Sequence, residues 1–159
     1  MTGRNQLVDS LIAVAQGRDA SPPADHQMIW RVEQQFDIEL PEDMAAFYLS
    51  MDGMQWPTVP EHGWVRIWSL GSWRRVRDEA GLNSGSSNYD ALGHAIIVAD
   101  HCDESWWYAA DFRQPEVQPG FFLVDGLRPA KLVARGLSAF VAAVLADSVD
   151  IYPEQRSAG

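Results

Sequence analysis

A chain of 159 residues is long enough for one domain with a substantial core and too short for two comfortable ones. A composition of 47% hydrophobic and 21% charged residues excludes a disordered or fibrous protein. The formal net charge of −10 argues against direct binding to nucleic acid or to an anionic membrane, because contacts with phosphate need lysine and arginine.

The first 24 residues are predicted to form a helix and a linker. Leu7, Leu11 and Ile12 have the spacing of one helix face, and Asp9 interrupts an apolar run that would otherwise imitate a signal peptide. The run is also too short to cross a bilayer. A proline pair near residue 22 marks the linker. We therefore expect an amphipathic helix at the start of a cytoplasmic protein.

Two further helices are predicted before residue 54. Asp25 can cap a helix that runs to about Phe36, with a buried stripe at Ile29, Val32 and Phe36. Pro41 suits the first turn of the next helix, and the pair Asp52-Gly53 ends it, because glycine accepts the left-handed backbone that closes many helices. The apolar face of this helix comprises Met44, Phe47, Tyr48 and Met51.

The middle of the chain is expected to hold a loop, a short strand, a helix and a second loop. Prolines in residues 54–63 predict the first loop, and residues 65–68 form a strand pattern. The three-residue repeat of Leu70, Trp73 and Val76 predicts a helix over 69–80. Its solvent face would carry Arg74, Arg75 and Arg77. Residues 81–93, rich in Gly, Ser and Asn, predict an exposed, mobile loop.

The second half of the chain is predicted to be mostly strands. Residues 95–100, 106–112 and 121–124 are rich in β-branched or aromatic residues, and the first two flank a turn at 101–105. A turn at Asp125-Gly126, a strand at 131–134 and a closing helix at 137–146 follow. A single domain would span 1–147, with a mostly polar tail at 148–159. Helices first and strands afterwards favour an α+β fold.

Three segments carry a resemblance to a known family. The first is Leu40-Pro41-Glu42-Asp43 followed by Phe47-Tyr48-Leu49 and Asp52-Gly53. The second, 95–111, is an apolar strand that ends in acids and leads into an aromatic strand, and the third, 121–145, holds the last strands and helix. In this order they resemble the SUKH superfamily and its Smi/Knr-like branch. Met44 departs from the family's usual aromatic residue, and Asp52 from its frequent Asn.

The resemblance implies a mixed, mainly antiparallel twisted sheet flanked by N-terminal helices and a C-terminal helix, used for protein binding. Many bacterial members look like immunity proteins that neutralise a toxin, often a nuclease. Fungal relatives act as regulatory scaffolds, which is the alternative here. The acidic charge fits capture of a basic toxin domain, because opposite potentials speed association.

The central hairpin supplies the candidate partner-binding site. Four carboxylates fall within residues 100–111 without a lysine or arginine among them, and Trp106 and Trp107 point to opposite faces of a strand. One of these two should be core, and the other, taken as Trp107, would lie beside the acids as a contact residue. The competing interpretation is a solvated hairpin with ordinary turn acids. The candidate residues are Asp100, Asp103, Glu104, Trp107 and Asp111.

Two other classes of function fit parts of the sequence. His101 and Cys102 could belong to a metal-dependent hydrolase, but a turn cannot direct consecutive side chains at one ion, and no zinc-binding spacing occurs. No nucleophile elbow, dinucleotide fingerprint or phosphate loop is present either. We therefore expect a non-enzyme with no metal and no cofactor. A carbohydrate-binding module is the third hypothesis, with indoles that stack on sugar rings from Trp56, Trp64, Trp68 and Trp73.

Overall fold

The computed structural model describes residues 21–54, 65–79 and 89–153, together with Gln6, Asp9, Ile12, Ala13 and Leu82. Most of the helix predicted near residues 7–15 and of the loop predicted at 54–63 lies outside these residues. In chain order the elements, with η for a 3-10 helix, are α2 (His26–Phe36), α3 (Glu42–Ser50), β1 (Val65–Ile67), η2 (Leu70–Ser72), β2 (Arg74–Arg75), η3 (Val76–Asp78), η4 (Asp90–Leu92), β3 (Ile96–His101), β4 (Trp106–Asp111), β5 (Gly120–Val124), β6 (Lys131–Arg135), α5 (Leu137–Leu145) and η5 (Val149–Ile151).

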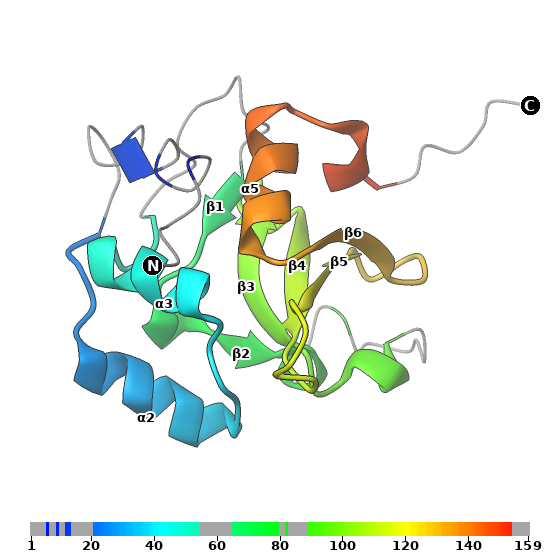
Figure 1. Ribbon diagram of the computed structural model, residues 1–159. Coiled ribbons are helices and arrows are strands. Elements are labelled where there is room, and N and C mark those ends of the chain that lie inside the picture. Colours follow the sequence, from blue (N-terminus) through cyan, green and yellow to red (C-terminus); the bar gives the residue numbers. More distant parts are fainter. Residues whose placement is uncertain are drawn as a thin grey trace, which may run out of the picture.

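The strands form one sheet in the order β1-β3-β4-β5-β6, and β2 also pairs with β3 (Figure 1). All of these pairings are antiparallel. β1 and β2 share one edge of β3, since Val65 pairs with His101 at one end of that strand and Arg75 with Ile96 at the other. The α+β fold with a mainly antiparallel sheet flanked by helices is thereby confirmed.

The two N-terminal helices lie beside β1 and β2, whereas α5 lies against the sheet nearer β6 (Figure 1). Asp25 caps α2 as predicted, because its Oδ1 accepts a hydrogen bond of 2.8 Å from the Met28 amide. Asp37 then ends the helix with a left-handed φ of 52°. The predicted stripe of α2 is buried, as is the predicted apolar face that leads from α3 into Met51.

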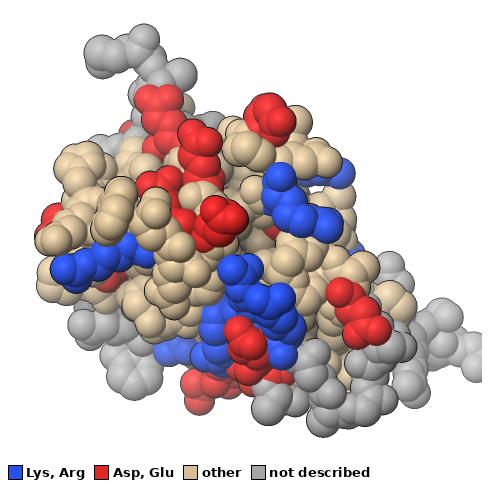
Figure 2. Space-filling view, turned by 90° about the horizontal axis from the view of Figure 1, so that it is seen from below, with Lys and Arg blue, Asp and Glu red and all other residues tan. Residues whose placement is uncertain are grey.

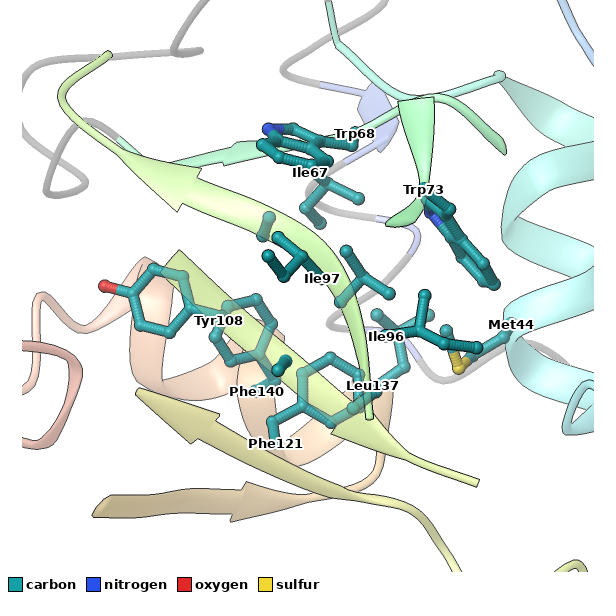
Figure 3. Close-up of a cluster of buried hydrophobic side chains, with 14 of the residues drawn as sticks. Met44, Ile67, Trp68, Trp73, Ile96, Ile97, Tyr108, Phe121, Leu137 and Phe140 are labelled. Carbon is teal, nitrogen blue, oxygen red and sulfur yellow. The ribbon is translucent and has the colours of Figure 1, made fainter. Parts of the chain in front are cut away.

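β3 is buried along its whole length, so the core lies on both of its faces. On one side the Phe140 ring of α5 packs against Tyr108 and Phe121, with centroid separations of 5.1 and 4.8 Å. On the other side of β3 lies Trp73 (Figure 3). Its ring packs edge-on against that of Tyr48. A fully buried phenylalanine such as Phe140 contributes about 1.5–3 kcal/mol through the apolar area it removes from water. The β3–β4 hairpin is therefore packed between α5 on one side and the segments that carry Trp73 and Tyr48 on the other.

The helix predicted over residues 69–80 is wrong. The chain there forms two 3-10 turns, η2 and η3, separated by β2. Leu70, Trp73 and Val76 are buried as the repeat implied, but a spacing of three also suits 3-10 turns, which have three residues per turn. The pairing of β2 with β3 then fixes the backbone of Arg74 and Arg75 in strand geometry.

The described part of the segment 81–93 is not an exposed loop throughout. Tyr89 is buried, and its hydroxyl donates a hydrogen bond of 2.6 Å to the carbonyl of Arg128 and accepts one of 2.8 Å from the Gly126 amide. Tyr89 therefore fixes the turn at Asp125-Gly126. Residues 81–93 show no periodic apolar pattern, because one buried aromatic residue cannot produce a repeat.

The first part of the C-terminal tail is packed against the sheet. Ile151 is fully buried, and its carbonyl accepts a hydrogen bond from the hydroxyl of Tyr108. The Tyr152 ring meets the His101 ring edge-on at 5.3 Å. Residues 154–159 lie outside the described part of the chain. Among the described residues, none of the helices combines the length and the apolar character needed to span a bilayer.

Candidate functional site

The five residues predicted as a partner-binding site lie at both ends of the β3–β4 hairpin. We call residues 100–107 the turn end, and residues 94–96 and 111–113 the open end. Asp103 and Glu104 lie in the exposed turn, and Trp107 follows in β4, partly buried. Asp111 is the last residue of β4 and lies at the open end. The structure thus divides the predicted cluster into two regions.

Asp100 lies beneath the surface of the turn end. It is fully buried, and its Oδ2 accepts hydrogen bonds from Arg66, its direct neighbour across from β1, and from the Trp68 indole Nε1 at 3.1 Å. Burial raises the pKa of Asp100, an effect that the hydrogen bonds from Arg66 and Trp68 partly offset. Asp100 is therefore a structural ion-pair partner, which corrects its placement among exposed contact residues.

Glu104 and Trp107 are held together at the surface of the turn end. The Glu104 Oε1 atom accepts hydrogen bonds from Arg74 at 2.8 Å and from the Trp107 Nε1 atom at 3.3 Å. Arg74 also pairs with Glu79, and its guanidinium lies 4.7 Å from the centre of the Trp68 ring. Such a cation–π contact contributes about 0.5–1 kcal/mol at an exposed site. The acid and the indole therefore reach the surface in a fixed arrangement.

The backbone of the turn presents the acids outward. Cys102, Asp103 and Glu104 have consecutive positive φ angles of 44°, 55° and 64°. This left-handed conformation costs a residue with a side chain roughly 1–2 kcal/mol, so the strands on either side must hold it. Ser105 closes the turn by donating a hydrogen bond of 2.9 Å to the carbonyl of Cys102. Asp103 is exposed at the tip.

A shallow hollow of about 170 Å³ opens beside this turn. Its walls come from β1, η2, β2 and the turn, so it joins segments that are far apart in the sequence. Basic and acidic side chains meet in it. The lining residues are Met54, Arg66, Trp68, Ser69, Ser72, Arg74 and Glu104.

Sequence reasoning did not assign Arg66, Trp68 or Arg74 to this region. Arg66 and Trp68 are two residues apart, the spacing of side chains on one face of a strand, and both contact the same carboxylate. Their partner, Asp100, is 34 residues away from Arg66, and local spacing carries no signal for such a pairing. Arg74 was placed on the solvent face of a helix that does not form.

The open end of the hairpin has a different electrostatic arrangement. Asp111 accepts two hydrogen bonds from the Arg113 side chain, at 3.1 and 3.0 Å, and its Oδ1 lies 3.1 Å from the His94 Nε2 atom. Burial alone would raise the pKa of Asp111, but the hydrogen bonds from Arg113, together with His94, lower it below the usual value. Asp111 is therefore ionised and already paired within the chain.

The residues proposed for metal or sugar chemistry are not arranged for it. His101 is buried, with its ring stacked 3.9 Å from that of Trp106, while Cys102 points to solvent in the turn. Trp68 and Trp73 are buried, so neither can stack on a sugar; Trp56 and Trp64 lie outside the described residues. The described residues hold no group of three or more histidine, cysteine or acidic side chains suited to a metal ion.

Comparison with known proteins identifies a family. Residues 23–143 match the model of the SMI1 / KNR4 family (SUKH-1). Of the elements in the described residues, this span includes α2, α3, β1 to β6 and most of α5. A search of the curated proteins found no match. The matched span includes both ends of the hairpin and stops before the packed segment around Ile151.

Proposed function

Because the chain belongs to the SMI1 / KNR4 family (SUKH-1), whose domains are of the immunity and protein-interaction type, we propose that it is a cytoplasmic immunity protein that binds and neutralises a cognate, basic, nuclease-type toxin. The net charge of −10 supports a basic partner, because opposite potentials steer the two proteins together and disfavour wrong partners. A regulatory scaffold without a toxin is the alternative within the same family.

The observation that carries the proposed contact surface is the pairing of Glu104 with Trp107 at the exposed turn end. The Glu104 side chain is 42% exposed, so a partner's lysine or arginine can reach it. Trp107 supplies an aromatic anchor whose indole is already oriented by its hydrogen bond to Glu104. Asp103 adds a second exposed carboxylate at the tip of the turn. The proposed surface therefore comprises Asp103, Glu104 and Trp107, supported from below by Asp100 and Arg66.

The first test is protection of cells. The probe is a toxin domain encoded beside the gene for this chain, produced in cells with and without the chain. We expect growth to be restored only when the chain is present, and the purified proteins to form a stoichiometric complex. Restored growth without a complex, or a complex that leaves the toxin active, would count against the immunity function. A complex with a harmless partner alone would favour the scaffold.

The second test locates the surface. Trp107→Ala should raise the dissociation constant about 30-fold, as expected for a hot-spot aromatic residue. Glu104→Lys should raise it about tenfold and slow association most at low salt, because the steering potential is screened as ionic strength rises. Glu116→Lys is the matched control, since Glu116 is an exposed acid beyond the open end of the hairpin. Equal effects of Glu104→Lys and Glu116→Lys would show that net charge, rather than the turn end, determines binding.

A further inference from the structure

A second hollow lies at the open end of the hairpin, beneath the C-terminal end of α2. It has a volume of about 310 Å³, close to the lower limit of ordinary ligand pockets. Phe36, Ile96 and Phe112 supply apolar walls, and Arg75, Arg77 and Arg113 supply charged groups. The view from below shows Lys and Arg side chains gathered in the middle of this face, with Asp and Glu side chains directly beside them (Figure 2). Three arginines thus line one hollow of a chain whose net charge is −10.

Within the described residues, two of these arginines, Arg75 and Arg77, form no ion pair with a carboxylate. Arg75 donates hydrogen bonds to the carbonyls of His94 and Phe36, at 3.3 and 3.1 Å, and lies over the Phe36 ring. Both acceptors are neutral, so its guanidinium is fixed in place without a counter-charge. Arg77 is exposed and lines the hollow, and none of the ion pairs between described residues involves it.

The acids near the hollow do not cancel this charge. Asp111 pairs with Arg113, so these two charges offset each other. Asp37 lines the hollow and is exposed, which leaves one acid against Arg75 and Arg77. The hollow therefore keeps a positive excess, and a fixed guanidinium beside aromatic rings suits a planar anion attached to an apolar group.

We propose that this hollow is a binding site for a carboxylate carried next to an apolar side chain, such as the C-terminal residue of a protein partner. Arg75 and Arg77 would pair with the carboxylate. The apolar side chain would lie against Ile38, which is partly exposed, and against the edges of Phe36 and Phe112 that reach the hollow. The site lies at the opposite end of the hairpin from the surface proposed for toxin binding. A negative result at one site therefore does not affect the proposal for the other.

N-acetyl-phenylalanine is a suitable probe, because it combines a free carboxylate with an aromatic side chain. In a titration of the ¹⁵N-labelled full chain, we expect saturable shifts of the amide resonances of His94, Phe112 and Arg113. N-acetyl-phenylalaninamide, which lacks the charge, should leave them unchanged. Equal shifts with the amide, or shifts elsewhere, would overturn the proposal. Binding of inorganic phosphate in the absence of binding by N-acetyl-phenylalanine would overturn it in favour of a phosphate site.

Charge variants at the rim make the test independent of folding. Arg77→Gln should weaken binding of N-acetyl-phenylalanine about fivefold, because this is the effect on a dissociation constant of losing the attraction between two unit charges about 4 Å apart in water. Asp37→Asn should strengthen it by a similar factor, and Asn tolerates the left-handed backbone at this position. Arg31→Gln removes an exposed arginine of α2 that does not line the hollow, and it should have no effect. Equal effects of Arg31→Gln and Arg77→Gln would overturn the proposal.

Discussion

The two ends of the β3–β4 hairpin use carboxylates in opposite ways. At the turn end Asp100 is fully buried, and its partner Arg66 comes from a strand far away in the sequence. At the open end Asp111 is partly exposed, and its partner Arg113 follows two residues later. The pKa of Asp100 is raised because burial outweighs its hydrogen bonds, whereas the pKa of Asp111 is lowered because its hydrogen bonds outweigh burial.

This difference separates acids that build the fold from acids that meet solvent. A buried ion pair is costly to break, because the remaining charge has no water to stabilise it. An exposed ion pair contributes little, because water and salt replace the lost partner. β2 connects the two regions, since Arg74 extends to Glu104 at the turn end and its neighbour Arg75 to His94 at the open end. Successive residues of a strand point to opposite faces of the sheet, so the side chains of Arg74 and Arg75 leave this dipeptide in different directions.

The largest expected effect is at the turn end. Arg66→Met should lower the free energy of unfolding by about 3 kcal/mol, because it leaves Asp100 buried without its counter-charge. This value is at the low end of the range for buried pairs, since Arg66 itself is partly exposed. The double variant Arg66→Met with Asp100→Asn should lose only about 1 kcal/mol, because the amide still accepts the hydrogen bond from Trp68. Urea unfolding of the single and double variants measures both values. If the double variant lost as much free energy of unfolding as Arg66→Met and Asp100→Asn lose together when each is made alone, the two residues would not be stabilising the fold as a pair.

The sequence predicted most elements around the hairpin, because their signals are local. The content of β-branched and aromatic residues located β3, β4 and β5 within a residue or two, and Asp25 correctly marked the start of α2. The 3-10 turns around β2 were missed because a three-residue apolar repeat does not distinguish them from an α-helix. The residues that pair with β2, Ile96 and Ile97 of β3, lie more than twenty residues later in the chain.

The candidate site was less predictable than the fold. Charge spacing grouped Asp100 with Asp103 and Glu104, but it could not show that Asp100 would be buried by β1. The exposed aromatic residue of α2, Trp30, was not singled out, although 60% of its surface is accessible. Both properties depend on which elements pack together, and this is decided by contacts between distant segments rather than by residue type.

A second, intermediate effect concerns pH at the turn end. Burial lowers the pKa of His101 to about 4, and the negative charge of nearby Asp147 offsets only part of this decrease. The unfolded chain then binds a proton between about pH 6.5 and 4 that the folded chain does not, so stability must fall as the pH falls through this window. Between pH 7 and pH 5 the free energy of unfolding should drop by roughly 2 kcal/mol.

The variant His101→Phe isolates this contribution. A phenyl ring can retain the stacking on Trp106, so the variant should have nearly wild-type stability at pH 7. Chemical denaturation at pH 7 and pH 5 should then show a smaller loss on acidification than in the unaltered chain. The same loss in both proteins would mean that His101 does not control the acid sensitivity of the turn end.

The smallest effect is expected at the open end. Arg113→Gln removes the exposed partner of Asp111 and should lower the free energy of unfolding far less than Arg66→Met does, because water can take the place of the guanidinium. The pKa of Asp111 should rise toward its usual value, since the hydrogen bonds from Arg113 are the main influence that lowers it. Denaturation at neutral pH and an NMR titration of the Asp111 carboxyl group measure the two quantities. A loss near the 3 kcal/mol expected for Arg66→Met would contradict the contrast between the two ends, because an ion pair open to solvent would then be stabilising the fold as strongly as a buried one.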